Sequence, residues 1–205
     1  MDTEERRNER RAQARASLEA LLEGNRRFAS GDPDGAHLDR AAREALVEGQ
    51  APTAVVLGCV DSRVPPEVIL DQGVGDLLTV RTAGQSLSGV AMGSLDFGVR
   101  VLGVPLVVVM GHTHCGAVLA AISDQNITGY LGDLIGEIAD RLVDVVGDKD
   151  PMRATGGNLD ATVEALRRYD LRSGDGDPAH VVGLMYDLAS GLVTVHGDDG
   201  LLVGS

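Results

Sequence analysis

The sequence predicts an α/β fold in which a mainly parallel sheet of four or five strands is flanked by helices. Short, continuous apolar runs recur along the chain, as is typical of strands that are buried on both faces. Helical patterns lie between these runs, and such alternation favours parallel pairing with right-handed crossovers. The 205 residues, 43% of them hydrophobic, are enough for one sizeable core and short for two. We therefore expect a single domain over residues 1–205.

The chain opens with a predicted helix over about residues 8–29, within an N-terminal helical arm that covers residues 1–35. Its apolar side chains recur at helical spacing and are Leu18, Leu21, Leu22 and Phe28. This face must pack either on the chain's own sheet or on another subunit. A Gly- and Asp-rich break follows, and Asp39 can cap a second short helix that ends near Gly49.

Five apolar runs predict the strands, and three helical patterns fill the space between or after them. The strand runs cover residues 53–59, 77–82, 106–112, 181–186 and 192–196. The helical patterns cover residues 88–102, 131–146 and 159–171. The turn at residues 189–191 joins the last two runs like a hairpin.

Composition excludes several classes of function. The chain has 18 Lys and Arg against 31 Asp and Glu, a formal charge of −13, so it should repel nucleic acids and anionic membranes. Two cysteines cannot form a disulfide-rich secreted scaffold. No apolar run approaches the roughly 18 to 20 residues that span a bilayer. The charged N-terminus also lacks the apolar stretch of a secretory signal, so we expect a cytoplasmic protein.

The residues with the most chemical potential follow two of the predicted strands. The first run ends in Cys59-Val-Asp61-Ser-Arg63, and the third ends in His112-Thr-His114-Cys115. In an open α/β sheet, ligands bind beyond the carboxyl ends of the strands. Two thiolates and an imidazole suit zinc, whose fourth position would be open to water or to the carboxylate of Asp61.

Plainer readings of the same residues remain open at this point. A free cysteine is often a small core residue, and two cysteines can also form a redox pair, although no Cys-x-x-Cys motif is present. Asp61 and Arg63 could be an ordinary ion pair at a loop. His114 could compete with His112 as a ligand, but His112 ends the strand and is preferred. His114 would then be a solvated loop residue or a proton carrier.

Five motifs of the sequence are similar to those of the β-class carbonic anhydrases. The two that carry the candidate ligands are C-V-D-S-R at 59–63 and G-H-T-H-C-G at 111–116. The resemblance extends in the family's order to E-G-N-R-R-F at 23–28, G-D-L-L-T-V-R-T-A-G at 75–84 and M-Y-D-L-A-S-G at 185–191. It thus covers most of the chain.

The resemblance implies reversible hydration of CO2 to bicarbonate and a proton by a zinc-bound hydroxide. It implies Cys59, His112 and Cys115 as zinc ligands, with Asp61 and Arg63 as a catalytic dyad beside the metal. Asp61 would become the fourth ligand only in a closed, inactive state.

For the substrate, the resemblance implies that Gln50 and the backbone of Gly116 bind CO2 or bicarbonate. In the family, the glutamine commonly reaches the site from across a dimer interface. The resemblance also places the N-terminal helix on a neighbouring subunit, so a homodimer or a homotetramer is expected.

Two other functions remain as alternatives. The first is a non-catalytic protein for assembly or sensing, in which Asp61 closes a structural zinc site permanently. The second is a zinc hydrolase that acts on a CO2-like molecule such as CS2 or COS. The residues do not separate CO2 from these substrates, because the choice depends on access to the pocket.

Overall fold

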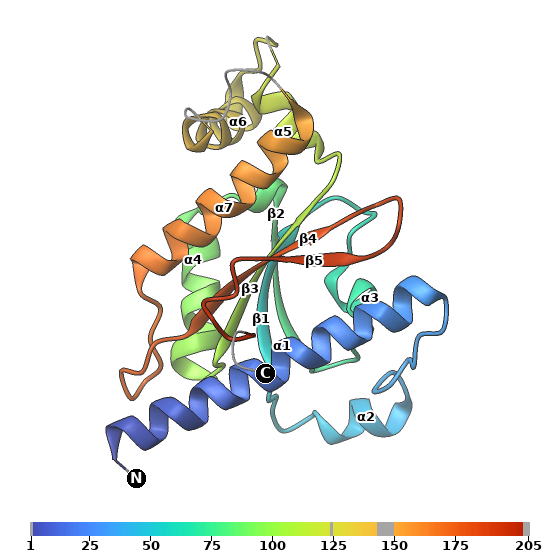
Figure 1. Cartoon of the computed structure of the whole chain (residues 1–205), viewed down its shortest axis with the longest axis vertical. Helices are drawn as coiled ribbons and strands as arrows, with labels where there is room; N and C mark the ends of the chain where they lie inside the picture. The colour runs from blue at the N-terminus through green and yellow to red at the C-terminus, as the bar shows by residue number, and fades with distance from the viewer. Residues whose placement is uncertain (1, 124, 143–149, 203–205) are drawn as a thin grey trace.

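Five strands form one sheet in the computed structural model, which describes residues 2–123, 125–142 and 150–202 (Figure 1). The strands are β1 (Ala54–Cys59), β2 (Leu77–Thr82), β3 (Leu106–His112), β4 (His180–Tyr186) and β5 (Val193–His196). Their order is β2-β1-β3-β4-β5, and only the β4–β5 pair is antiparallel. The predicted α/β class and all five predicted strands are confirmed, with the last strand reached by the expected hairpin.

Helices cover both faces of the sheet. They are α1 (Thr3–Ser30), α2 (Arg40–Ala45), α3 (Pro66–Ile69), α4 (Gly89–Asp96), α5 (Gly116–Ala121), α6 (Gly129–Arg141) and α7 (Pro151–Tyr169), with the short turns η1 (Ala83–Gln85) and η2 (Phe97–Val101). Figure 1 shows α4 and α7 on one side of the sheet and α1 and α3 on the other. None of these helices, in the described part of the chain, combines the length and apolar character needed to cross a membrane.

The central strands are buried on both faces, which explains their continuous apolar runs. Every residue of β1 and β3 is buried. Even-numbered residues such as Val56 and Val108 pack on the side of α1, whereas odd-numbered ones such as Val55 and Val107 pack on the side of α7. This alternation is the two-residue period of a strand.

The chain changes direction across the sheet between β1 and β3. From β1 it moves outward to β2, and it then returns to place β3 on the other side of β1. Such a reversal leaves a crevice beyond the carboxyl ends of the two strands, where ligands of open α/β sheets bind. The two strands on either side of this reversal are those that the candidate ligands follow.

Helix α1 begins about five residues earlier than the apolar pattern predicts. The carboxylate of Asp2 caps it by accepting a hydrogen bond from the Glu5 amide, and the polar first turns carry no apolar periodicity. Farther along the helix, Leu18 and Leu21 are fully buried in the chain's own core. For these two side chains, the chain's own core is therefore the packing partner.

The motif at residues 23–28 fastens the end of α1 to the rest of the chain. A Cβ at Gly24 would lie 2.0 Å from the Leu70 carbonyl oxygen, so the helix approaches the end of α3 without room for a side chain. The buried Asn25 amide donates to the carbonyls of Ile69 and Gly191 and accepts from the Val193 amide. This part of the resemblance thus has a structural role.

Other helices differ from their predicted bounds for local reasons. The pattern at 88–102 is broken after Asp96, where η2 has the wider π-helical hydrogen bonding. Helix α7 begins eight residues before its predicted start, because Asp150 caps it and Pro151 occupies its first turn. Helix α6 ends at Arg141, and residues 143–146 of its predicted range lie outside the described residues. The short helices α3 and α5 have too few turns for periodicity to reveal them.

A buried carboxylate links α1 to the loop that follows it, and this contact gives a testable prediction for stability. Asp71 accepts hydrogen bonds from the Arg27 guanidinium and from the amides of Asp34 and Gly35. Burial opposes ionisation, but these three donors outweigh it and hold the pKa of Asp71 below its ordinary value of 3.8. Ionised Asp71 therefore stabilises the fold at pH values above 3.8, and this stabilisation is lost as the pH falls through the lowered pKa of the folded state.

Asp71→Asn is expected to lower the free energy of unfolding at neutral pH by about 1–3 kcal/mol. Asparagine tolerates the positive φ of 48° at this position, so the change mainly removes the charge. Urea unfolding at pH 7 and below pH 4 measures the effect, and the difference from the wild type should shrink in acid. Asp96→Asn, which breaks the exposed pair with Arg100, is the control and should cost less than about 1 kcal/mol. An equal loss in both variants would contradict the assignment.

Candidate metal centre

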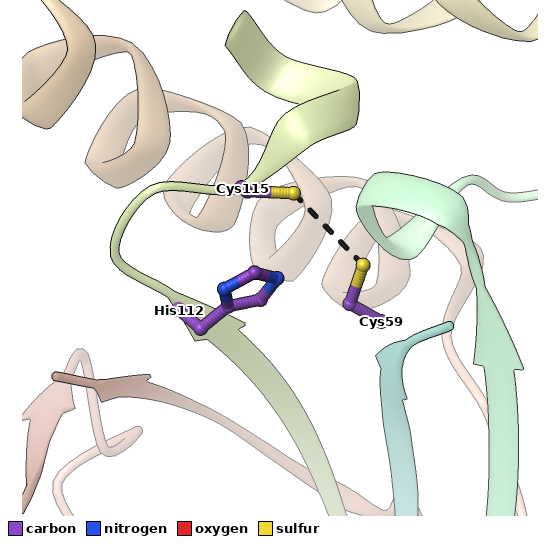
Figure 2. Close-up of side chains that lie close together, drawn as sticks. All are labelled: Cys59, His112 and Cys115. Atoms are coloured by element: carbon purple, nitrogen blue, oxygen red, sulfur yellow. Dashed lines mark hydrogen bonds between the residues drawn. The ribbon is translucent and has the colours of Figure 1, made fainter. Parts of the chain in front are cut away.

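Three side chains from the ends of β1 and β3 converge beyond the sheet (Figure 2). Cys59 is the last residue of β1, His112 is the last residue of β3, and Cys115 directly precedes α5. The two Sγ atoms are 3.9 Å apart, and one ligand atom from each residue lies within 4.8 Å of the other two. All three side chains are buried, with at most 3% of any residue exposed.

His112 has the orientation of a metal ligand. Its Nδ1 lies 2.9 Å from the Thr113 carbonyl oxygen, which can only accept, so Nδ1 carries the proton. Its Nε2 then carries an unprotonated lone pair. This buried atom has no hydrogen-bond partner in the described part of the structure. Metal-bound histidines typically make this backbone contact through the other ring nitrogen. The orphaned Nε2 beside two thiols fits a soft or borderline cation such as Zn²⁺.

The thiols influence each other's ionisation. The hydrogen bond with Cys115 lowers the pKa of Cys59 below its ordinary value, and the same interaction raises the pKa of Cys115. Without a cation, the pair therefore keeps one proton, because two thiolates this close repel each other. A bound metal ion would remove that repulsion and ionise both.

The Asp61 carboxylate lies beside this group and is held by Arg63. Arg63 Nε donates to Asp61 Oδ1 at 2.9 Å, Nη2 donates to Oδ2 at 2.6 Å, and the Arg63 amide also donates to Oδ1. The side-chain hydrogen bond from Arg63 holds the pKa of Asp61 well below its usual range. Asp61 Oδ2 lies 4.0 Å from His112 Nε2, so an ionised acceptor faces the candidate ligands.

A family model described as carbonic anhydrase matches residues 54–193, a range that runs from the start of β1 to the start of β5. The chain belongs to the β-class carbonic anhydrase family. The match includes both strand ends that supply the converging side chains, whereas α1 lies outside it.

Curated relatives from mycobacteria agree with this family. The chain is 48% identical over 128 residues to "Carbonic anhydrase 2" of Mycobacterium tuberculosis, a match that covers 60% of this chain and 62% of that protein. It is 37% identical over 191 residues to "Carbonic anhydrase" of Mycolicibacterium smegmatis, covering 87% of this chain and 91% of the relative. The first of these matches thus spans less than two thirds of the relative's length.

Solved structures of the family share the fold. The β-carbonic anhydrase CafA of Aspergillus fumigatus superposes with a TM-score of 0.62 at 28% identity, over 75% of this chain and 79% of that one. A Coccomyxa β-carbonic anhydrase gives a TM-score of 0.64 at 24% identity, over 87% of this chain and 85% of that one. The second likeness concerns the fold alone.

The remaining predicted residues lie at different distances from the candidate metal centre. Gly116 opens α5 next to Cys115 and is exposed, with open space where a Cβ would be. His114 is exposed with a positive φ of 55°, and it contributes its carbonyl oxygen to Arg63 rather than its ring. Gln50 is exposed and precedes β1, whereas Cys59 ends that strand. From Ala54 to Cys59 the strand rises about 17 Å, and Gln50 precedes its opposite end, away from this chain's own candidate centre.

Two contacts that support the centre join residues from different motifs of the resemblance. Arg81, on β2, donates from Nε to the Cys59 carbonyl oxygen at 2.7 Å and from Nη2 to the Asp61 carbonyl oxygen at 2.6 Å. On the other side, Thr113 Oγ1 donates to Asp187 Oδ1, which belongs to the motif at 185–191. Each contact joins residues that are at least 20 positions apart. Only the fold brings them together.

Proposed function

We propose that the chain catalyses the reversible hydration of CO2 to bicarbonate and a proton, with Zn²⁺ held by Cys59, His112 and Cys115. One observation carries the proposal. An ionised carboxylate, Asp61, faces the orphaned Nε2 of His112 at 4.0 Å while Arg63 engages both of its oxygens. A bound zinc ion would supply a Lewis acid that lowers the pKa of water to near neutrality.

The role of Asp61 follows from its environment. A carboxylate with a strongly lowered pKa is a poor proton acceptor at neutral pH, so Asp61 acts by orientation. It would accept a hydrogen bond from the attacking water, whose other proton is released to solvent, and would leave an oxygen lone pair directed at the carbon of CO2. Arg63 fixes Asp61 in this position and keeps it away from the metal. The amide of Gly116 would face the substrate beside Cys115.

The alternative of a closed, structural zinc site requires Asp61 to leave Arg63. Its Oδ1 accepts two hydrogen bonds and its Oδ2 accepts one, all from Arg63, which opposes that change. A zinc hydrolase for CS2 or COS would use the same residues, and no contact of the site favours it over CO2 hydration.

Stopped-flow CO2 hydration across pH, with parallel elemental analysis, tests the proposal. We expect one zinc ion per chain. We also expect activity that increases with pH, because two thiolate ligands neutralise the charge of the ion, which would then lower the pKa of water less than an ion with neutral ligands would. Zinc-loaded protein without CO2 hydration would refute the proposal. Turnover of CS2 or COS in that sample would favour the hydrolase, and inactivity on all three gases would favour the structural site.

The position of Gln50 supports a shared site in a dimer. A two-fold interface could bring Gln50 of each subunit to the metal centre of its partner, because an isologous contact is reciprocal. We therefore propose that the chain self-associates at least as a homodimer, with Gln50 binding substrate across the interface.

Subunit complementation tests this arrangement. Cys59→Ser and Gln50→Ala proteins, each of low activity alone, are unfolded together, reassembled with zinc and assayed. Random assortment makes half of the dimers mixed, each with one intact site, so about a quarter of wild-type activity should return. The control mixes Cys59→Ser with Asp61→Asn, whose altered residues lie at the same site, and should recover none. No recovery in the first mixture, or an active monomer, would contradict the shared site.

A further inference from the structure

The turn η1, which follows β2, contacts the sulfur of Cys59. The Gly84 amide donates a hydrogen bond to Cys59 Sγ, with the nitrogen 3.5 Å from the sulfur. Both groups are buried, so this contact is not exchanged for one with water. A hydrogen bond to an ionised sulfur draws electron density away from it.

The backbone of this turn has an unusual conformation that surrounding residues must maintain. Gly84 has a φ of 58°, and the next residue, Gln85, has a φ of 54°, a region that non-glycine residues rarely adopt. A Cβ at Gly84 would lie 2.6 Å from Ile138 Cδ1 and 3.3 Å from Ala117 Cβ. The amide of Gly84 therefore points at Cys59 only while the turn is held against α5 and α6.

A buried asparagine on α7 holds the turn from behind. Asn158 Nδ2 donates to the Gly84 carbonyl oxygen at 2.9 Å and contacts Gln85 Oε1 at 3.3 Å. Asn158 is 1% exposed and Gln85 is 2% exposed. Arg141 Nη1, on α6, lies 3.4 Å from the Gln85 carbonyl oxygen and also donates to Thr162 Oγ1. Asn158 is 74 positions from Gly84 and makes no hydrogen bond with any of the three candidate ligands.

We propose that Asn158 is a positioning residue that, by fixing Gly84, aims an amide at Cys59 and limits electron donation from its thiolate to the metal. The proposal rests on the metal site described under the proposed function. Its consequence is a more electron-poor metal ion than the two thiolates alone would give. Supporting contacts of this kind commonly change metal affinity or activity by roughly 10- to 100-fold.

The wild-type protein allows a direct test that needs no substitution. Nitrogen-labelled protein is loaded with a spin-active cadmium isotope, and the amide signals are examined for scalar coupling to the metal. We expect the Gly84 amide to couple to cadmium through Cys59 Sγ. Cadmium bound at Cys59 without this coupling would overturn the inference and leave the metal site intact.

A variant adds an electronic measurement. Asn158→Leu removes the donor and keeps the number and branching of side-chain heavy atoms, and cobalt is loaded at the candidate site so that thiolate-to-metal charge transfer is visible. The band should move to lower energy, because the Cys59 thiolate donates more strongly once the hydrogen bond from the Gly84 amide is lost. The control is Thr155→Val, which removes a buried hydroxyl from α7 that, among the residues the structure describes, bonds only to the Pro151 carbonyl oxygen.

The outcomes separate this inference from the proposed function. An unshifted band in folded, cobalt-loaded Asn158→Leu protein would refute the role of Asn158, as would an equal shift in Thr155→Val. Absence of a thiolate-to-cobalt band in the wild type would refute the metal site itself. If Asn158→Leu fails to fold by circular dichroism, Asn158→Ala, which also removes the donor to the Gly84 carbonyl, is loaded with cobalt and judged by the same band shift.

Discussion

Cys59→Ser and Cys115→Ser proteins are expected to lose the bound metal and, with it, CO2 hydration. Each substitution removes one of three converging, buried ligands and replaces a soft thiolate with a hydroxyl that zinc binds poorly. The loss of affinity should exceed the roughly 10- to 100-fold that a supporting contact costs. Elemental analysis after dialysis against a weak chelator, together with stopped-flow assays, measures both effects.

The histidines of the same motif provide a matched comparison. His112→Ala should lose the metal as the cysteine variants do, because Nε2 of His112 is the orphaned atom beside the thiols. His114→Asn should keep it, because the His114 ring is exposed and asparagine accepts the positive φ at that position. Metal retained in His112→Ala but lost in His114→Asn would reverse the ligand assignment.

The second large effect is expected at the Asp61–Arg63 pair. Asp61→Asn and Arg63→Ala should keep the metal but lower kcat/KM for CO2 hydration on the order of 100-fold or more. Asp61→Asn removes the ionised carboxylate that is proposed to orient the attacking water. Arg63→Ala removes the hydrogen bonds that hold this carboxylate, so that it can move toward the metal site. The measurement is stopped-flow hydration at several pH values on samples of known metal content.

The chain offers a control pair with the same spacing. Asp170 and Arg172 form an exposed ion pair two positions apart, with Arg172 Nε donating to Asp170 Oδ2 at 2.7 Å. Asp170→Asn should leave both hydration and metal content unchanged. Wild-type turnover in Asp61→Asn, or an equal loss in Asp170→Asn, would refute the proposed dyad.

The sequence was sufficient for the central strands because burial on both faces leaves a strong signal. The runs that became β1 and β3 are continuously apolar, and the residues that end them are chemically distinctive. The convergence of Cys59 with His112 then follows from parallel pairing on either side of a reversal in strand order. The sequence also favoured His112 over His114 as a ligand, and the structure gives His112 the buried ring.

Contacts between distant segments could not be predicted in the same way. In the sequence, Arg81 is a charged residue within an otherwise apolar strand pattern. In the structure, two of its nitrogens donate hydrogen bonds to carbonyl oxygens of the Cys59–Asp61 segment. Asn158 reads as a polar residue within a helix that also contains two glycines, and its partner in η1 is far away in the chain. No local period encodes such pairs, since their geometry exists only after the layers have packed.

The separation of the two cysteines along the chain bears on the order of assembly. Cys59 and Cys115 are 56 positions apart and lie at the ends of different strands, so they meet only after β1 and β3 have paired in register. The long loop between them must close first, and this closure is an entropic cost that the apolar strands rather than the metal offset. Metal capture is therefore a late event that follows chain collapse. Protein that has already folded could then take up the proposed metal ion later, without new synthesis.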